Sequence, residues 1–337
     1  MTTIALLFGG ANSEHEVSLA SARGILAAID RDLHDVVLIG ADRGGRWHRV
    51  DEITDVDITT ASGSALPDLD GIDLALPVLH GRFGEDGTLQ GLLELAGVPY
   101  AGCGVLASAL AMDKLVAGRV LREAGIPTVP SHPVSEADRL DAAVQAARLG
   151  YPVFVKPNRS GSSVGAHLVA DASQLAAALD DALLNDDLAL IQPVQTGEEI
   201  DIGVLQLADG SLITGAALRV HPSGEARFFD YAAKYTAGGA RFEVPAALRP
   251  ELLATLTALA TAAFVALRCE GLARVDFFVD PDGSVRVNEV NTLPGLSALS
   301  QFPAMFRAVG RDLPSVVDTM IERALSARPA PRMPASE

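Results

Sequence analysis

Cysteine and basic residues are both scarce in this sequence. Its 337 residues include two cysteines, Cys103 and Cys269, which form neither a disulfide framework nor a metal-ligand spacing. Lys and Arg number 26 against 43 Asp and Glu, which gives a formal net charge of -17. Nucleic acids and anionic membranes bind clustered positive charge, so we expect neither as a partner. A pocket that gathers the few cations could still bind a small phosphate compound.

Long uninterrupted hydrophobic runs are also missing. The stretch 95–112 is broken by Pro99 and three glycines, and the stretch 252–267 is short and contains three threonines. The first ten residues lack the basic segment and the cleavage site of a secretion signal, and two glycines interrupt their apolar stretch. We therefore expect a cytoplasmic protein without a membrane-spanning helix.

Hydrophobic residues make up 49% of the chain and charged residues 20%, the balance of an ordinary globular protein. The length favours two or three domains. Apolar segments at 3–8 and 74–79, with a glycine turn and a helix after the first, predict a parallel α/β layer. We predict an α/β protein with α+β elements. Its expected domains are 1–103, 104–197 and 198–325, followed by a disordered tail at 326–337.

A predicted hairpin in the last third of the chain gathers charged side chains on one face. If residues 280–283 form the whole loop, Asp276 lies opposite Val287 and Arg274 lies opposite Glu289. A loop of odd length would place the two carboxylates on opposite faces of the hairpin. The chemistry of this face therefore depends on the length of one turn.

Asn291 would project to the same side as Asp276 and Glu289. Two carboxylates and an amide oxygen are the kind of oxygen set that holds Mg²⁺ between a protein and a phosphate. The alternative is that both carboxylates form an ion pair with Arg274. Because the neighbouring face of the hairpin is uniformly apolar, the convergence of charges favours the metal site.

A loop of small residues, 160–165, follows an apolar strand that ends in Lys156. Small residues let backbone N–H groups approach phosphate oxygens, and the lysine would add a positive charge. The loop lacks the Gly-Lys-Ser/Thr of a P-loop, and such loops are more often plain turns. Lys114, near a predicted helix start, is a second candidate cation, although a solvated helix lysine is the simpler interpretation.

Two residues near the predicted parallel strands could meet a ligand. Glu14 follows the Gly9-Gly10 turn, where it would either favour the start of a helix or bind a ligand amine. His80 follows the segment 74–79 and could be an acid or base, or a hydrogen-bonded structural histidine. Ligands in such layers bind beyond the carboxyl ends of the strands, where these loops would lie.

In eight ordered segments the sequence resembles the D-alanine–D-alanine ligases of the ATP-grasp superfamily. The segments are Gly9-Gly10 with 13–19, 79–91, 111–115, 155–157, 161–165, 230–235, 271–276 and 288–295. Each segment alone is weakly specific. Their order and their spread over nearly the whole chain make the resemblance strong.

The resemblance implies an ATP-grasp fold, with an N-terminal Rossmann-like domain and central and C-terminal domains that hold ATP between them. It implies an ATP- and Mg²⁺-dependent ligase that joins two D-alanine molecules for peptidoglycan synthesis, and hence for cell-wall biogenesis and cell shape. The first carboxylate attacks the γ-phosphate of ATP, and the second amine attacks the resulting acyl phosphate with loss of phosphate. Two Mg²⁺ ions, with Mn²⁺ as a substitute, and a homodimer formed through the N-terminal domain are expected on the same ground.

The resemblance also assigns residue roles. Substrate contacts are expected from Glu14, His80, Arg274, Gly295, Ser300 and Gln301; ATP contacts from Lys114, Lys156, Ser162, Ser163, Gln192, Glu199 and Lys234; catalytic roles from Glu14, Ser162, Tyr235, Arg274 and Gly295; and metal contacts from Asp276, Glu289 and Asn291. Among these, Glu14 would hold the ammonium of the first substrate, and Arg274 with the Gly295 N–H would bind the oxyanion. Tyr235 would connect through Ser162 to Glu14.

Two positions depart from the family pattern. Gln192 stands where a glutamate near adenine is usual, although its amide oxygen can still accept a hydrogen bond. Gln301 stands where Leu or Met is usual, near the second substrate. The alternative function is therefore a ligase with D-serine, D-lactate or another second substrate, in a resistance or specialised pathway. Tyr235 favours an amine. A catalytically silent ATP-binding regulator is a further alternative, against which the intact Arg274 argues.

Overall fold

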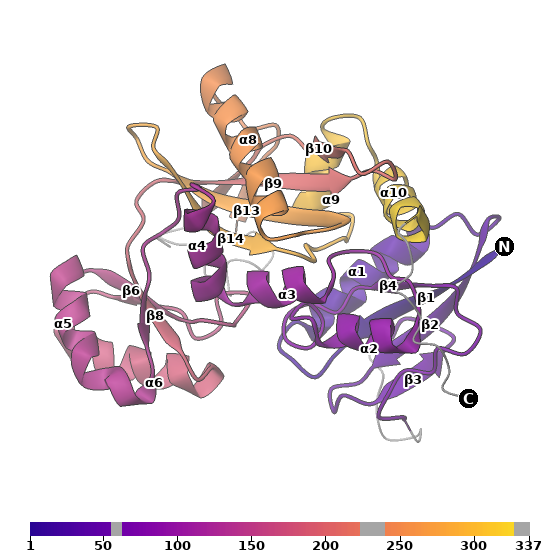
Figure 1. Cartoon of the computed structure of the whole chain (residues 1–337), viewed down its shortest axis with the longest axis horizontal. Helices are drawn as coiled ribbons and strands as arrows, with labels where there is room; N and C mark the ends of the chain where they lie inside the picture. Colours follow the sequence, from indigo (N-terminus) through magenta and orange to yellow (C-terminus); the bar gives the residue numbers. More distant parts are fainter. Residues whose placement is uncertain (55–62, 223–239, 327–337) are drawn as a thin grey trace.

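Three sheets form the framework of the computed structural model, which describes residues 1–54, 63–222 and 240–326 (Figure 1). The first sheet has the order β3-β2-β1-β4, in which β1 is parallel to β2 and β4, and β3 is an antiparallel edge. Its strands are β1 (Thr2–Gly9), β2 (His34–Ala41), β3 (Trp47–Val50) and β4 (Leu74–Pro77). The helices α1 (His15–Ala28) and α2 (Thr88–Ala96) follow β1 and β4. The predicted parallel α/β layer is confirmed.

The second sheet is antiparallel, with the order β5-β8-β6-β7. Its apolar side chains form a core with α5 and α6, on the left of Figure 1. The elements are β5 (His132–Val134), α5 (Arg139–Leu149), β6 (Val153–Pro157), β7 (His167–Val169), α6 (Leu175–Asn185) and β8 (Ala189–Pro193). The helices α3 (Val105–Met112) and α4 (Lys114–Glu123) connect the first sheet to it. A capping box forms between Ser135 and Asp138 ahead of α5.

The third sheet is also antiparallel and has the order β12-β11-β9-β13-β14, with β10 paired to β9. Its strands are β9 (Glu198–Gln206), β10 (Leu212–Thr214), β11 (Leu218–Pro222), β12 (Ala240–Glu243), β13 (Leu272–Val279) and β14 (Val285–Asn291). One face packs on α8 (Pro250–Ala266) through Ile200, Ile202, Val275 and Phe277. Because side chains alternate along a strand, the residues between these point to the other face. That face carries the charged residues of the site.

The turn between β13 and β14 differs from the predicted one. Val279 pairs with Val285, so the loop has an odd number of residues, 280–284, which alone would place Asp276 and Glu289 on opposite faces. The register shifts by one residue between Asp276 and Phe277, and Asp276 therefore pairs directly with Glu289. The predicted pairings of Asp276 with Val287 and of Arg274 with Glu289 are both wrong, since Arg274 pairs with Asn291, but this β-bulge restores the shared face.

The end of the described chain returns to the first sheet. After α9 (Gln301–Arg307), the helix α10 (Leu313–Ser326) packs beside α1 and contributes Val316, Val317 and Met320 to the same core as β1. The connection before α9 also touches α1, since a Cβ at Gly24 would lie 2.6 Å from the carbonyl oxygen of Leu296. This packing places the segment after β14 against α1. The domain boundaries stay a prediction.

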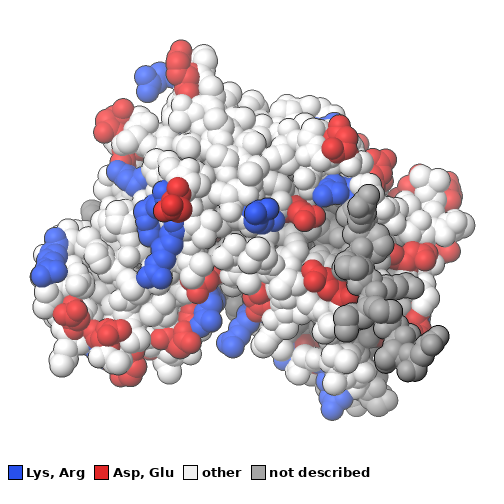
Figure 2. Space-filling view, in the orientation of Figure 1, with Lys and Arg blue, Asp and Glu red and all other residues white. Residues whose placement is uncertain are grey.

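Acidic and basic side chains are interspersed among uncharged ones on the face shown in Figure 2. Among the described residues, none of the helices combines the length and the apolar character that a membrane span requires.

Candidate active site

A pocket lies where the loops of the three sheets meet. The first layer contributes Glu14, His80 and Glu85 to its wall, and the central loop contributes Gly161 and Ser162. The other predicted site residues in the lining come from the third sheet and the segment after it, namely Glu199, Arg274, Glu289, Asn291, Gly295, Ser300 and Gln301. Residues that are almost 290 positions apart in the sequence therefore share one cavity.

The carboxylate of Glu14 is enclosed by loops from two other parts of the chain. Glu14 precedes α1 but makes no capping hydrogen bond to it; its side chain accepts a hydrogen bond from the Ser162 hydroxyl instead. A Cβ at Gly81 would lie 2.2 Å from Glu14 Oε2, and one at Gly161 would lie 2.7 Å away. A side chain at either glycine would displace the Glu14 carboxylate. The partner expected beyond Ser162, Tyr235, lies outside the described residues, as does Lys234.

Asn12, which the sequence analysis did not single out, joins the two loops of the first layer. Its Nδ2 donates to the carbonyl oxygens of His80 and Arg82 at 2.9 Å each. Its Oδ1 accepts from the backbone N–H of Glu14 at 2.8 Å. The position of Glu14 thus depends on a polar contact between segments that are separated by a whole βαβ unit.

His80 lies buried in the pocket wall, with both ring nitrogens in hydrogen bonds. Nδ1 is 2.9 Å from the carbonyl oxygen of Leu293, and Nε2 is 2.9 Å from Ser21 Oγ. A carbonyl can only accept, so Nδ1 carries the proton and Nε2 accepts from Ser21. Burial lowers the pKa of His80, which outweighs the opposing effect of the Glu14 charge. A neutral histidine therefore joins the first layer to the segment after β14.

Glu85 is a pocket residue that the sequence analysis named only as part of a matching segment. Its Oε1 accepts a hydrogen bond from the Gly81 N–H at 2.7 Å. Burial raises the pKa of Glu85 to about 8, and the nearby charges of Glu14 and Glu289 act in the same direction. The carboxyl group is thus protonated at neutral pH, and no sequence signal distinguished it from the solvated acids around it.

Arg274 and Asp276 form a two-pronged ion pair on the polar face of β13. Arg274 Nε is 2.6 Å from Asp276 Oδ1, and Nη2 is 2.7 Å from Oδ2. Asn291 Nδ2 also donates to Asp276 Oδ2 at 2.9 Å, whereas Glu289 faces Lys114 at 3.6 Å. The alternative of an ion pair with Arg274 thus holds for Asp276 but not for Glu289. The structure brings together all three predicted metal-binding residues.

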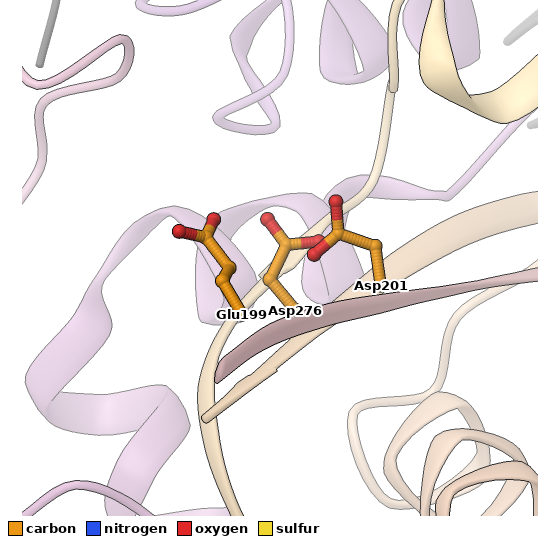
Figure 3. Close-up of side chains that lie close together, drawn as sticks. All are labelled: Glu199, Asp201 and Asp276. Atoms are coloured by element: carbon orange, nitrogen blue, oxygen red, sulfur yellow. The ribbon is translucent and has the colours of Figure 1, made fainter. Parts of the chain in front are cut away.

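Asp201 is a further carboxylate of this face that the sequence analysis missed. It lies directly opposite Asp276 in the β9–β13 pair and is fully buried. Oxygens of Glu199, Asp201 and Asp276 lie within 4.8 Å of one another, and Figure 3 shows the three side chains projecting from the strands to the same side. Burial by itself would lower the pKa of Arg274, but the charges of Asp276 and Asp201 raise it above its usual value. The signal for Asp201 was a charge within the otherwise apolar run of β9.

The two lysines approach the hairpin from the central part of the chain. Lys114, the first residue of α4, donates from Nζ to the Ser160 carbonyl at 2.7 Å. Lys156, on β6, donates to Asn288 Oδ1 at 3.3 Å, where the bulge of β14 lies. Ser162 and Ser163 adopt positive φ angles of 51° and 58°, an uncommon backbone for non-glycine residues that often marks ligand loops.

The remaining predicted residues divide between two places. Gly295, Ser300 and Gln301 line the pocket, and the Ser300 hydroxyl lies 2.8 Å from that of Ser297. Gln192 on β8 lies outside this pocket lining, is buried, and donates from Nε2 to Ser131 Oγ at 2.7 Å. This contact leaves its amide oxygen as the acceptor that the sequence analysis invoked.

Two family models match the chain, one described as the N-terminus of D-ala D-ala ligase over residues 3–103 and one as its C-terminus over residues 120–322. The chain belongs to the D-Ala-D-Ala ligase family. It is 42% identical to D-alanine–D-alanine ligase A of Mesorhizobium japonicum over 351 residues, covering 96% of this chain and 98% of that protein. The D-alanine–D-alanine ligase of Mycobacterium tuberculosis is 39% identical over 357 residues, with coverages of 96% and 95%.

Solved structures of the family have the same fold. The VanG D-Ala:D-Ser ligase of Enterococcus faecalis superposes with a TM-score of 0.83 at 33% identity, covering 96% of this chain and 99% of that one. The D-alanine–D-alanine ligase of Coxiella burnetii gives a TM-score of 0.82 at 30% identity, with coverages of 96% and 94%. The predicted ATP-grasp fold is confirmed.

Proposed function

We propose that this chain is an ATP-dependent ligase that joins two D-alanine molecules into D-alanyl-D-alanine, a precursor for peptidoglycan synthesis. The observation that carries the proposal is the convergence of Glu14 and Arg274 in one pocket of a chain that belongs to this ligase family. A carboxylate suits the ammonium of an amino acid, and a guanidinium suits its carboxylate. The pocket thus offers both charges that a zwitterionic substrate needs.

In the first step, a carboxylate oxygen of the first D-alanine attacks the γ-phosphorus of ATP, and ADP leaves. Two anions must approach each other, so the step depends on positioning and charge neutralisation. Arg274, Lys114 and Lys156 are the cations that the described structure gathers near the pocket. The lysines and the loop 160–165 would contact phosphate oxygens, with Lys234 as a further cation. Gln192 and Glu199 would contact adenine and ribose.

In the second step, the amine of the second D-alanine attacks the acyl carbon, and inorganic phosphate leaves the tetrahedral adduct. Arg274 and the Gly295 N–H would donate to the oxyanion, and donors of this kind typically contribute ~10²–10³ in rate. Ser300 would contact the carboxylate of the second substrate. Glu14, fixed by Ser162 and two glycine backbones, would keep the first substrate in place through both steps.

Mg²⁺ fits the donor set of the hairpin. Asp276 pairs directly with Glu289, and Arg274 pairs with Asn291. Because Arg274 and Asp276 are two residues apart on β13, their partners point to the same side. The side chains of Asp276, Glu289 and Asn291 therefore share one face of the hairpin. Carboxylate and amide oxygens are the donors that hard divalent cations prefer. A bound Mg²⁺ would supply positive charge to the transferred phosphoryl group, and two ions, or Mn²⁺ instead, belong to the proposal.

The test is phosphate release measured with ATP, Mg²⁺ and D-alanine together and with each one omitted. We expect release only from the complete mixture, and D-alanyl-D-alanine as the product by mass spectrometry. D-serine and D-lactate, each mixed with D-alanine, test for another second substrate. No phosphate from the complete mixture would refute the ligase.

We also propose that the chain acts in the cytoplasm, where ATP is supplied, and forms a homodimer through its N-terminal layer. The family resemblance supports both. Analytical ultracentrifugation at several protein concentrations tests the dimer, because a monomer at all of them would contradict it.

A further inference from the structure

Arg274 has fewer donors available for substrate than its guanidinium carries. Of five N–H groups, Nε and one N–H of Nη2 bind Asp276 at 2.6 and 2.7 Å. One N–H of Nη1 donates to Gln301 Oε1 at 3.0 Å. Within the described part of the chain, two N–H groups remain, one on each Nη nitrogen. Their directions depend on how firmly the protein holds the other three.

Gln301 is itself held by Asp201. Its Nε2 donates to Asp201 Oδ2 at 2.9 Å, while its Oε1 accepts from Arg274. Arginine only donates and a carboxylate only accepts, so these partners permit one orientation of the amide. In the reversed orientation the amide oxygen would face the Asp201 carboxylate, and the amide N–H groups would face the N–H groups of Arg274. The hydrogen bonds therefore run in one direction, from Arg274 as donor through Gln301 to Asp201 as acceptor.

The same contacts decide which carboxylate Arg274 binds. Asp201 and Asp276 lie opposite each other on β9 and β13, and both are buried, so they compete for one cation. Arg274 Nε lies 2.6 Å from Asp276 and 3.8 Å from Asp201. Gln301 binds Asp201 Oδ2, the same oxygen that lies 3.8 Å from Arg274 Nε, while the guanidinium pairs with Asp276.

The backbone of Gln301 is also firmly placed. Gln301 begins α9, whose buried Phe302 and Phe306 pack against Gly203 of β9; a Cβ there would lie 2.9 Å from the Phe306 ring. Precise side-chain contacts require such support from the surrounding structure.

We propose that Gln301, oriented by Asp201, is a positioning residue that fixes the guanidinium of Arg274 so that its two remaining N–H groups face the reacting carboxyl group. The reaction in this inference rests on the proposed function, whereas the hydrogen bonds that hold Arg274 do not depend on it. It gives Gln301 a role through Arg274 rather than through the second substrate alone. It also gives Asp201 a part in the reaction although Asp201 lies outside the pocket lining.

The experiment compares Gln301→Leu, Asp201→Ala, Asp201→Asn and the double variant Gln301→Leu/Asp201→Ala by kcat, KM for ATP and Tm. Gln301→Leu is expected to lower kcat about 10-fold or more, with KM for ATP within about 2-fold of the parent, because a small misplacement of a positioned group is costly. Asp201→Ala should lower kcat similarly, and Asp201→Asn, which keeps an acceptor for Gln301, should lower it less. The double variant should resemble Gln301→Leu.

Gln206→Leu is the matched control. Gln206 ends β9, the strand that carries Asp201. Like Gln301, it accepts a hydrogen bond from an arginine, here from Arg323 Nε at 2.9 Å, but it lies outside the pocket lining. Its loss should leave kcat unchanged. Parent-like kcat in Gln301→Leu would overturn the proposal, and additive effects of Gln301→Leu and Asp201→Ala would overturn the part assigned to Asp201.

A readout independent of turnover separates this inference from the proposed function. Hydrogen exchange of the Arg274 Nη protons, followed by NMR, should be faster in Gln301→Leu than in the parent and in Gln206→Leu. Equal exchange would overturn the positioning. If the parent releases no phosphate, the ligase proposal fails, and the exchange rates decide the positioning by themselves.

Discussion

Replacing Gly161 by alanine tests whether the pocket depends on the close packing around Glu14. The new Cβ would lie 2.7 Å from Glu14 Oε2 and 3.2 Å from Oε1, whereas ordinary contact begins at 3.4 Å. The carboxylate would have to move by roughly 0.7 Å. It has little freedom to do so, because Ser162 binds one side and the Gly81 backbone closes the other.

A displacement of this size in a substrate-holding group can reduce productive binding by roughly 10- to 100-fold. We expect the KM for the first D-alanine to rise by that factor in steady-state phosphate release. The KM for ATP should change by less than about 2-fold, since the proposed role of Glu14 is to hold the amino acid and not ATP. The Tm should change little, because Gly161 lies in a loop that lines the pocket.

Gly91→Ala is the control for an added methyl group. Gly91 lies within α2, and its nearest side-chain contact would be 3.9 Å away, so alanine should be neutral or stabilise the helix by about 0.5–1 kcal/mol. A KM for D-alanine in Gly161→Ala equal to that of the parent would refute the reasoning about Glu14.

Three further perturbations follow from the charges of the site. Arg274→Ala should lower kcat by ~10²–10³ while ATP still binds, as measured by turnover and by calorimetry; unchanged turnover would contradict an oxyanion role. The pKa of Glu85 is about 8 in the folded chain, whereas the same carboxyl group in the unfolded chain loses its proton near the ordinary pKa of glutamate. Between these two pH values the folded chain binds more protons than the unfolded chain, so Glu85 lowers the free energy of unfolding as the pH rises toward 8. Urea unfolding without ligands should therefore show a smaller loss of stability between pH 5 and 8 in Glu85→Gln, and equal slopes would show that Glu85 does not cause the loss. Removing divalent cations with EDTA should abolish phosphate release and added Mg²⁺ should restore it, with Asp276→Asn requiring at least 10-fold more Mg²⁺; activity that survives EDTA would exclude the metal site.

The hairpin of β13 and β14 shows which features of a sheet an alternating sequence pattern can predict. Alternation along β13 correctly separated the apolar Val275 and Phe277 from Arg274 and Asp276. The predicted register was wrong, because the rule of two residues per repeat assumes an unbroken ladder. The spacing of the buried Val285, Val287 and Val290, two residues and then three, indicates the bulge in retrospect.

Glu85 and His80 show a different limit. Both belong to a glycine-rich loop in which charged residues are usually solvated, and the shifts of their pKa values arise from burial against groups distant in sequence. His80 meets Leu293 across more than two hundred residues. No local pattern contains that contact, so the choice between acid–base and structural roles required the fold.

By itself, the sequence determined the α/β layer, the polar face of the last hairpin and membership of an ATP-dependent ligase family, because periodicity and ordered motifs are local properties of the chain. Tertiary structure alone decided that Asp201 opposes Asp276, that Gln301 joins Asp201 to Arg274, and that two glycine backbones enclose Glu14. These contacts depend on strand order and on the return of the chain after β14. Charge competition between buried groups acts through space, and its outcome is set only when distant segments pack together.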